Sequence, residues 1–366
     1  MHIKSLYIHV PFCQHKCAYC IFYSVPGARP RVIQRYLQRL DADFKYAATM
    51  CGPLDSIYIG GGTPSLLSLP QCHFLLNSIR QYFTIRAGCE FTFECNPGSL
   101  SPAKLETLKS FGVNRISLGV QSFNAEHRRI LGRECTDREI ADALEMLAHA
   151  AVPKLGIDLI YGIPGQSLED WVADLRTACQ KGVHHISAYS LTVEEQSQLA
   201  RAGTEPAAPD LAVEMWDATA AELKEFGLER YEVSNYAKAG YACRHNLDIW
   251  HGKPYLGCGP AAASFDGTLR WTQTPDLNAW LRHEKPYIDE LTSEKRAAEI
   301  LAFGLRTVNG WDLPNFKTRT GYDAMALRGQ IIRQLCRQNL LECRDARLQP
   351  TRKGLLFADQ VAVDLL

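Results

Sequence analysis

Short apolar segments rich in β-branched and aromatic residues alternate along the chain with segments whose apolar residues recur at helical spacing. The apolar segments are 6–10, 56–60, 91–95, 115–120, 155–162 and 185–191. The helical segments between them are 32–47, 75–83, 101–112, 136–151 and 167–182. Because the apolar segments are almost continuously apolar, they are typical of parallel strands buried on both faces. The alternation therefore predicts an α/β fold in which helices cover a parallel sheet.

Several predicted helices carry recognisable residues at their ends. Ser101 precedes Pro102, which suits a capping residue followed by proline in the first turn. Gly112 and Gly182 follow the last apolar positions of two helices, where a left-handed residue commonly ends a helix. These residues place the helix boundaries between the predicted strands.

Polar and glycine residues stand at or just beyond the carboxyl ends of several predicted strands. They are the segment 60–63, Glu94, Gln121 and Asp158. An open sheet concentrates its ligand contacts at one switch point, whereas a barrel collects them from many strands. The distribution favours a partial (β/α)6 barrel of the TIM type.

The strand and helix alternation ends near residue 200. Segment 200–210 is rich in Ala, Pro and Gly, and it precedes a predicted helix at 211–227 and an irregular stretch at 231–267. Helical patterning returns from about residue 290. We therefore expect a barrel at 1–205, a connecting region at 206–285 and a smaller, mostly helical carboxyl-terminal domain at 286–366.

Composition and charge narrow the classes of ligand. The 366 residues are 46% apolar, which is enough for a sizeable core, and 40 basic residues balance 40 acidic ones. With a net charge near zero and no long run of either sign, the chain lacks the electrostatic signature of a nucleic-acid binder. Small molecules are therefore the expected ligands, and nucleic acid is not.

The first ten residues lack the apolar core of a secretory signal, and no apolar stretch is long enough to span a membrane. We therefore expect a cytoplasmic protein without a transmembrane segment. Most of the 13 cysteines are scattered and are expected to be reduced, buried side chains. Clustered cysteines in such a compartment point to metal binding or catalysis.

Three cysteines, Cys13, Cys17 and Cys20, form a C-x3-C-x2-C array after the first predicted strand. A structural zinc site normally has four protein ligands, and His9 or His15 lies close enough in sequence to be considered as the fourth. Alternatively, three thiolates can hold three irons of a 4Fe-4S cluster and leave the fourth iron open. The array alone leaves both metal sites possible, as well as an incidental grouping.

The array and the aromatic residue that follows it resemble the radical S-adenosylmethionine (SAM) superfamily, and the resemblance covers residues 5 to about 190. It implies that Cys13, Cys17 and Cys20 hold a 4Fe-4S cluster. It also implies that the amino and carboxylate groups of SAM chelate the open iron. Reductive cleavage of SAM would then yield methionine and a 5'-deoxyadenosyl radical.

The resemblance extends to residues at the other strand ends. The segment GGGTP at 60–64 implies that the backbone of Gly61, Gly62 and Thr63 meets the amino group of SAM, since only glycine allows so close an approach. Glu94 would face the sulfonium and amino groups, and Gln121 would bind ribose hydroxyls or a carboxylate. The alternative for Glu94 is an ion pair with Arg115 or Arg133.

Four further residues complete the expected site. Arg133 suits the methionyl carboxylate through its two-pronged guanidinium, and Asp158 suits the ribose diol. Tyr7 and Tyr19 would line the adenine or shield the cluster. The alternatives are a helix-capping role for Asp158 and ordinary core packing for both tyrosines.

A more specific set of motifs resembles the oxygen-independent coproporphyrinogen III oxidase-like family. They are YIHVPF before the triad, ECNPG, NRISLGVQSF, LGR and DLIYGIPGQ, together with LAFGLRTVNGWDL at 301–313. The dehydrogenases of this family carry a further cysteine after the triad and an amino-terminal extension. Phe22 stands in place of that cysteine, and only twelve residues precede Cys13. Both features favour the heme chaperone (HemW-type) branch.

The chaperone branch also carries an HNxxYW motif implicated in heme binding, and residues 245–250 read HNLDIW. The resemblance implies that His245 binds heme, and a neutral imidazole can ligate heme iron while Trp250 packs on the macrocycle. Ile249 replaces the tyrosine of the motif. Ile21 stands where the branch usually has aspartate.

These observations favour one function over two rivals. The expected function is a heme chaperone that binds a 4Fe-4S cluster, SAM and heme and delivers heme to heme-requiring proteins. The recipients would be respiratory proteins, some of them membrane-bound. The first rival is a coproporphyrinogen III dehydrogenase of porphyrin biosynthesis, and the second is a zinc-stabilised barrel. The sequence leaves the oligomeric state open.

Overall fold

Six parallel strands form the centre of the computed structural model, which describes residues 2–366. They are β1 (Ile3–Val10), β4 (Cys51–Gly61), β5 (Ile85–Cys95), β6 (Arg115–Gln121), β7 (Lys154–Tyr161) and β8 (His185–Ser190). Neighbours in the sheet follow chain order, so the sheet has no switch point among these strands. The partial (β/α)6 barrel is therefore confirmed, as are all six predicted strands.

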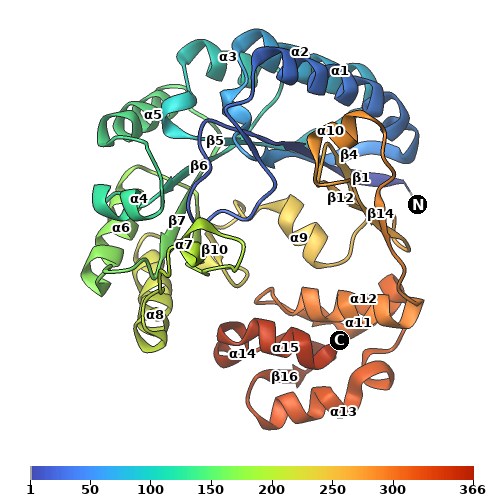
Figure 1. Cartoon of the computed structure of the whole chain (residues 1–366). Coiled ribbons are helices and arrows are strands. Elements are labelled where there is room, and N and C mark those ends of the chain that lie inside the picture. The colour runs from blue at the N-terminus through green and yellow to red at the C-terminus, as the bar shows by residue number, and fades with distance from the viewer. Residues whose placement is uncertain (1) are drawn as a thin grey trace.

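Helices cover the outer face of the barrel (Figure 1). The main ones are α1 (Pro30–Ala47), α2 (Leu69–Tyr82), α3 (Pro102–Ser110), α5 (Asp137–His149), α6 (Leu168–Gln180) and α8 (Pro209–Glu225). The predicted helix ends are confirmed, because Ser101 accepts the Lys104 backbone N–H at 3.2 Å. Gly112 and Gly182 have φ of 87° and 73°, which is the left-handed region.

Three short strands extend this sheet at both edges. β11 (Leu256–Cys258) runs parallel to β1, while β10 (Asn235–Ala237) and β9 (Glu229–Arg230) lie antiparallel beyond β8. The stretch 231–267 was expected to be irregular, and this expectation was wrong for β10, β11, β12 (Ala263–Phe265) and the helix α9 (Arg244–Trp250). Strands of three residues are too short to produce a readable hydrophobic period.

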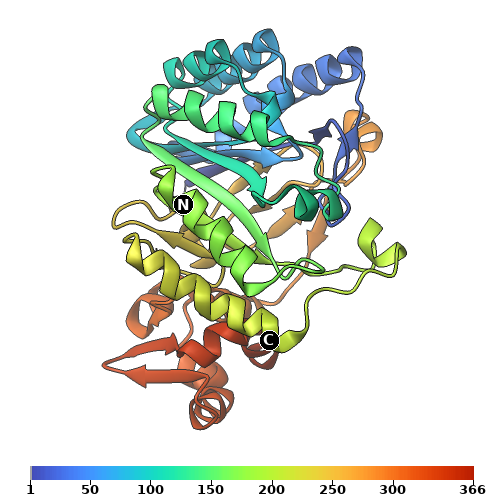
Figure 2. The ribbon, with the colours of Figure 1, turned by 90° about the vertical axis from the view of Figure 1, so that its left-hand side faces the viewer.

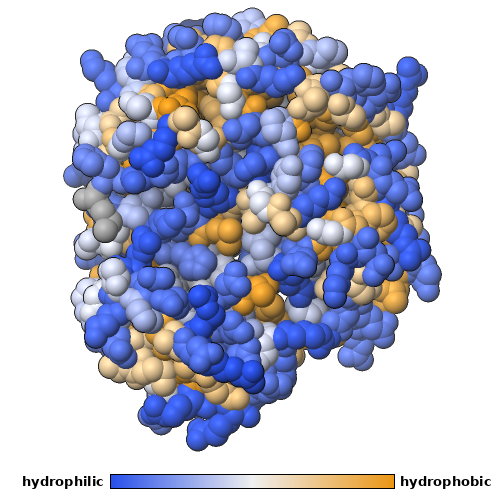
Figure 3. Space-filling model, turned by 180° about the vertical axis from the view of Figure 1, so that it is seen from behind, coloured by the Kyte–Doolittle hydropathy of each residue, from blue (hydrophilic) through white to orange (hydrophobic). Residues whose placement is uncertain are grey.

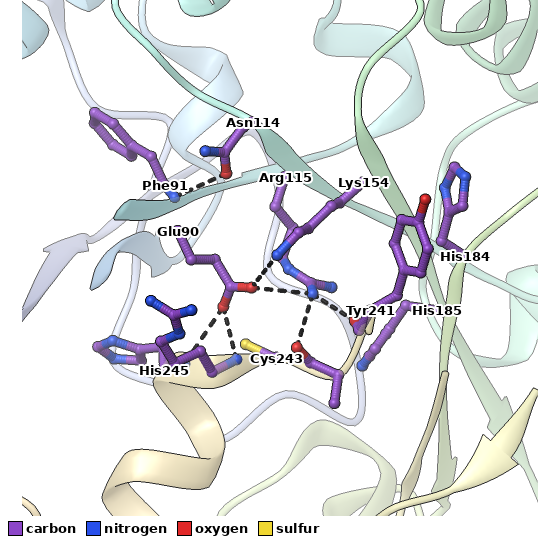
Figure 4. A network of polar contacts seen from close by, with 12 residues as sticks. Glu90, Phe91, Asn114, Arg115, Lys154, His184, His185, Tyr241, Cys243 and His245 are labelled. Atoms are coloured by element: carbon purple, nitrogen blue, oxygen red, sulfur yellow. Dashed lines mark hydrogen bonds and ion pairs between the residues drawn. The ribbon is translucent and has the colours of Figure 1, made fainter. Parts of the chain in front are cut away.

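Alternation along the strands makes the barrel interior polar. Ile57 and Ile59 are fully buried in the main hydrophobic core, so Tyr58 between them belongs to the opposite face. The interior residues nearest the amino ends of the strands include three charged side chains, Glu90, Arg115 and Lys154, which lie beside one another (Figure 4). The amino end of the barrel interior therefore contains a group of charged side chains.

Smaller elements connect these parts. They are β2 (Phe12–Cys13), β3 (Val25–Pro26), α4 (Ala125–Ile130), α7 (Gln198–Arg201), α9 (Arg244–Trp250), β12 (Ala263–Phe265), β13 (Arg270–Thr272), α10 (Leu277–Leu281) and β14 (Tyr287–Asp289), with 3-10 turns at Ala48–Met50, Pro64–Leu66 and Pro97–Ser99. Helix α9 lies between the barrel and the carboxyl-terminal helices (Figure 1).

The carboxyl-terminal region is mostly helical, as predicted, and it packs below the barrel (Figure 2). It contains α11 (Ser293–Gly304), α12 (Leu313–Thr320), α13 (Ala324–Arg337), α14 (Arg352–Leu356) and α15 (Ala358–Leu365), with a sheet of β15 (Trp311–Asp312), β17 (Arg347–Pro350) and β16 (Leu341–Arg344). Apart from Phe265, its buried hydrophobic cluster comes from residues 297–365. The boundaries expected at 205 and 285 stay predictions.

The surface is mainly polar. The face seen in Figure 3 carries apolar residues in several separate patches among polar ones. Within the described residues, no helix combines the length and the apolar character needed to cross a bilayer.

Candidate functional site

A pocket of about 400 Å³ opens at the carboxyl ends of the barrel strands. It brings together eleven of the residues singled out in the sequence: Cys13, Cys17, Tyr19, Cys20, Gly61, Gly62, Thr63, Glu94, Gln121, Arg133 and Asp158. Two others, Tyr7 and His245, do not line it. The predicted residues therefore converge on one site, although they come from a loop and several different strands.

The three cysteines of the triad follow β1 and form no disulfide; Cys13 ends β2, and Cys17 and Cys20 lie in the loop after it. Cys13 Sγ accepts from Thr63 Oγ1 at 3.7 Å, and Cys17 Sγ accepts from Arg133 Nη1 at 3.6 Å. Burial raises the pKa of the Cys13 and Cys20 thiols. A bound metal would displace these protons, and three sulfur donors suit a soft metal group.

Neither histidine near the triad is placed as a fourth ligand. His9 is buried, and its Nδ1 and Nε2 lie 2.9 Å from Tyr7 Oη and the Tyr23 carbonyl oxygen. His15 pairs with Glu134 at 3.0 Å on the exposed side of the loop. Among residues 2–366, no three His, Cys, Asp or Glu side chains are grouped to hold one metal ion.

The glycine segment after β4 brings backbone close to the cysteine loop. Gly61 has φ of 110°, and a Cβ there would lie 2.8 Å from the His9 ring. A Cβ on Gly62 would lie 2.7 Å from the Phe12 carbonyl oxygen and 3.0 Å from Cys13 Sγ. Only glycine fits at these two positions, which leaves backbone N–H and C=O groups next to the expected cluster.

Glu94 lies half-buried in the wall of the pocket. Its Oε1 accepts from Tyr58 Oη at 2.7 Å, and its Oε2 accepts from the Gly61 N–H at 3.2 Å. Burial, with Asp158 nearby, raises the pKa of Glu94 to about 7 in spite of these hydrogen bonds. A cation in the pocket would stabilise the ionised carboxylate, which is the role expected for Glu94.

The alternative ion pairs of Glu94 do not form. Arg115 pairs with Glu90 instead, at 3.1 Å. Arg133 donates to Cys17 Sγ, to the Gly119 carbonyl and, at 2.6 Å, to Asn96 Oδ1. The positive charge of Arg133 thus lies beside the cysteine loop.

Gln121 and Asp158 occupy the ends of neighbouring strands. Gln121 is the last residue of β6, and it is buried. Its backbone φ is 72°, a value that residues other than glycine rarely adopt. Asp158 lies within β7, so the helix-capping alternative was wrong. It accepts from Ser117 Oγ at 3.1 Å, and burial raises its pKa.

The two tyrosines differ in their surroundings. Tyr19 lines the pocket beside the cysteines. Tyr7 lies deeper, with its ring centroid 6.2 Å from that of Tyr58 and 6.5 Å from that of His245. Aromatic packing inside the barrel, the alternative considered for it, is what Tyr7 does.

His245 was expected in a loop, and the structure instead places it in the first turn of α9 inside the barrel. It is 3% exposed. Its Nδ1 lies 3.0 Å from Ser56 Oγ, and its ring centroid lies 5.2 Å from that of Tyr58. Burial lowers the pKa of His245 to about 4, so the imidazole is neutral at physiological pH. Its role as a heme ligand stays a prediction.

Asn96 and Tyr58 are among the residues of the site that sequence reasoning missed. Asn96 donates to Thr63 Oγ1 at 3.0 Å and accepts from Arg133, so it links the two side chains that contact the cysteines. Tyr58 positions Glu94. Asn96 directly follows a predicted strand and Tyr58 lies two residues before Gly60, so their positions relative to the strand ends were the available signals.

Two family models match the chain. Residues 7–178 match the Radical SAM superfamily, and residues 291–357 match the HemN C-terminal domain. The first match spans most of the barrel, and the second spans most of the carboxyl-terminal region.

Curated relatives match over almost the full length. The chain is 31% identical to the heme chaperone HemW of Bacillus subtilis, with 98% of each protein covered. It is 33% identical to HemW of Lactococcus lactis and 34% identical to HemW of Escherichia coli, with 98% of this chain and 96% of each relative covered.

A solved structure has the same fold. Coproporphyrinogen III oxidase (HemN) of Escherichia coli superimposes with a TM-score of 0.87 at 21% identity, covering 100% of this chain and 90% of the other. The predicted superfamily and branch are thus confirmed by the two family models and by the full-length relatives. The chain belongs to the radical SAM superfamily and, within its coproporphyrinogen III oxidase-like family, to the HemW branch.

Proposed function

We propose that this protein is a cytoplasmic heme chaperone that holds a 4Fe-4S cluster and SAM in the barrel pocket and passes heme to heme-requiring respiratory proteins. The observation that carries the proposal is the convergence of the triad with Glu94, Gln121, Arg133 and Asp158 in one pocket. Full-length relatives named heme chaperone support the choice of branch.

Cys13, Cys17 and Cys20 would hold the cluster. The group would supply an open iron for SAM and one-electron chemistry. Three thiolates match three irons of such a cluster, whereas a structural zinc site normally takes four protein ligands.

The protein side chains would orient SAM. Arg133 lies beside Cys17, where a guanidinium can take the methionyl carboxylate. Glu94 would balance the positive charge of SAM at the glycine segment, and Asp158 would accept from the ribose hydroxyls. Tyr19 would cover the cluster from the loop side.

The decisive experiment is anaerobic reconstitution of the protein followed by titration with heme, with coproporphyrinogen III assayed in parallel. We expect a Soret band that saturates at a fixed stoichiometry and no consumption of coproporphyrinogen III. Porphyrinogen consumption coupled to 5'-deoxyadenosine formation, without specific heme binding, would instead establish the dehydrogenase. The fold shared with HemN makes this rival worth testing.

A further inference from the structure

The side chain of Asn96 bonds to residues of the pocket and not to the turn that it begins. Asn96 directly follows β5 and is the capping residue of the 3-10 turn Pro97–Ser99, where asparagine ordinarily accepts from a backbone N–H of the turn. Here it makes no such hydrogen bond. Its Nδ2 instead donates to Thr63 Oγ1 at 3.0 Å, and its Oδ1 accepts from Arg133 Nη2 at 2.6 Å. Both partners line the pocket, so the contacts of Asn96 point to the site.

The donors and acceptors of this group can have only one order. Arginine only donates, so the oxygen of the Asn96 amide faces Arg133 and its nitrogen faces Thr63. The Thr63 oxygen accepts from Asn96, and its own proton donates to Cys13 Sγ at 3.7 Å. A hydroxyl proton rotates to suit its partners. Asn96 occupies the acceptor side of the Thr63 hydroxyl and therefore directs its proton at Cys13.

Asn96 also fixes the guanidinium of Arg133. Nη2 of Arg133 donates to both Asn96 Oδ1 and the Gly119 carbonyl, and Nη1 donates to Cys17 Sγ at 3.6 Å. A Cβ on Gly119 would lie 2.9 Å from Arg133 Nη2 and 3.3 Å from Asn96 Oδ1, so glycine leaves the room that this arrangement needs. Because Nη2 is held by two acceptors, Nη1 is kept toward Cys17.

Two of the three expected cluster ligands therefore receive a hydrogen bond that depends on Asn96. Cys13 receives it from Thr63, and Cys17 receives it from Arg133. Reduction of a bound cluster would place more negative charge on its sulfur ligands, so a hydrogen-bond donor stabilises the reduced state more than the oxidised one. The positive charge of Arg133 acts in the same direction. Both contacts therefore favour a higher reduction potential.

We propose that Asn96 is a positioning residue that raises the reduction potential of the cluster by directing Thr63 onto Cys13 and Arg133 onto Cys17. The inference rests on the proposed function for the presence of the cluster, and it adds which residue of the pocket tunes it. A higher potential lets a weaker electron donor reduce the cluster. Asn96 thus acts on the cluster through two other side chains.

The test measures the midpoint potential of the anaerobically reconstituted full-length protein, by redox titration followed with electron paramagnetic resonance. Asn96→Ala removes both contacts of the amide. Asn114→Ala is the matched control, because Asn114 is also half-buried and also uses both ends of its amide. It accepts from the Phe91 N–H at 3.0 Å and donates to the Cys89 carbonyl at 2.8 Å, at the opposite end of the barrel strands. Iron and acid-labile sulfide are measured in each variant.

We expect Asn96→Ala to lower the equilibrium constant for one-electron reduction about tenfold, which is a fall of about 59 mV in potential. Asn114→Ala should leave the potential unchanged. Thr63→Val removes the hydroxyl that donates to Cys13 and should lower the constant by a smaller factor, whereas Thr63→Ser keeps the hydroxyl and the wild-type potential. In the Thr63→Val background, Asn96→Ala should have a smaller effect than in wild type. Thr63→Val also serves as the test if Asn96→Ala does not fold.

Two results would overturn the inference alone. One is an unchanged potential in Asn96→Ala or Thr63→Val proteins that contain as much iron and sulfide as wild type. The other is an equal fall in potential in Asn96→Ala and Asn114→Ala. A wild type that takes up neither iron nor sulfide would refute the proposed cluster and the inference together. Because only that last outcome concerns the wild type, failure of the inference and failure of the proposed function are distinguishable.

Discussion

The hydroxyl of Tyr58 donates to Glu94 Oε1 at 2.7 Å while the ring of the same tyrosine lies 5.2 Å from the ring of His245. One side chain therefore contacts both the pocket that would hold SAM and the buried histidine. A substitution of Tyr58 therefore alters the surroundings of both Glu94 and His245.

Replacing Tyr58 with Phe should weaken SAM binding. The variant keeps the ring but leaves Glu94 with the Gly61 N–H as its remaining hydrogen-bond donor. A hydrogen bond to a charged group contributes about 1.5 kcal/mol. Its loss should therefore raise the dissociation constant of SAM roughly tenfold. Calorimetry with the reconstituted protein would measure it.

Tyr7→Phe is the matched control for that experiment. Tyr7 Oη lies 2.9 Å from His9 Nδ1, so its hydrogen-bond partner is His9 and not Glu94. SAM affinity should stay within about twofold of wild type, since the substitution removes a bond elsewhere in the same interior. Equal losses in both variants would contradict a specific role for Tyr58.

The pH dependence of SAM binding should follow Glu94. Its pKa is raised to about 7 by burial, so the carboxylate gains a proton as the pH falls below that value. A cationic ligand prefers the ionised form, and its affinity should fall by up to tenfold per pH unit below pH 7. A Glu94→Gln protein that shows the same slope would assign the proton to another group.

Glu94 should also make the stability of the ligand-free protein depend on pH, but in the opposite direction from SAM binding. The folded pKa of Glu94 exceeds its ordinary value of 4.5, so the folded ligand-free protein holds this proton more tightly than the unfolded chain. Its contribution is fully present below pH 4.5 and is lost as the pH rises through about 7. Denaturant titrations of wild type and Glu94→Gln between pH 5 and 8 would isolate this contribution as their difference.

Substitution of the triad should remove the iron group as a whole. We expect anaerobically purified wild type to contain iron and acid-labile sulfide, and Cys17→Ala to lose both together, because each thiolate holds one iron. Cys179→Ala, at a buried cysteine of α6 remote from the pocket, is the control and should retain both. One zinc ion bound per protein chain, without acid-labile sulfide, would instead favour the zinc-stabilised barrel.

Gly61→Ala should destabilise the protein more than Gly88→Ala. Both glycines have positive φ, 110° and 79°, so alanine costs about 1 kcal/mol at either. A Cβ at Gly88 meets open space, whereas one at Gly61 lies 2.8 Å from the His9 ring. That crowding adds about 1–3 kcal/mol. Thermal unfolding of the two variants would contradict this account if their midpoints fell equally.

The sequence predicts the barrel well because its signals are local. Each of the six long strands carries its own apolar segment, and Glu94, Gln121 and Asp158 could be placed from their positions in these strands. Strand β11 has three residues and gains its identity only by pairing with β1. The hydrophobic pattern of three residues is too short to predict this strand from the sequence.

The details of the site depend on contacts between distant residues. Glu90 caps a helix that lies 154 positions later in the chain, and nothing in its own segment indicates this partner. His245 could be identified from its motif, but its burial depends on β1 and β4 together. Residue types and strand ends were therefore predictable, while hydrogen-bond partners and accessibility were not.

The parallel pairing of β1 with β11 has a consequence for synthesis of the chain. One edge of β1 pairs with β4 early, but the other edge has no partner until residues 256–258 leave the ribosome. Unpaired strand edges invite association with other chains, and pairing between distant segments is slow. Until residues 256–258 are made, the edge of β1, which leads into the cysteine loop, therefore stays open.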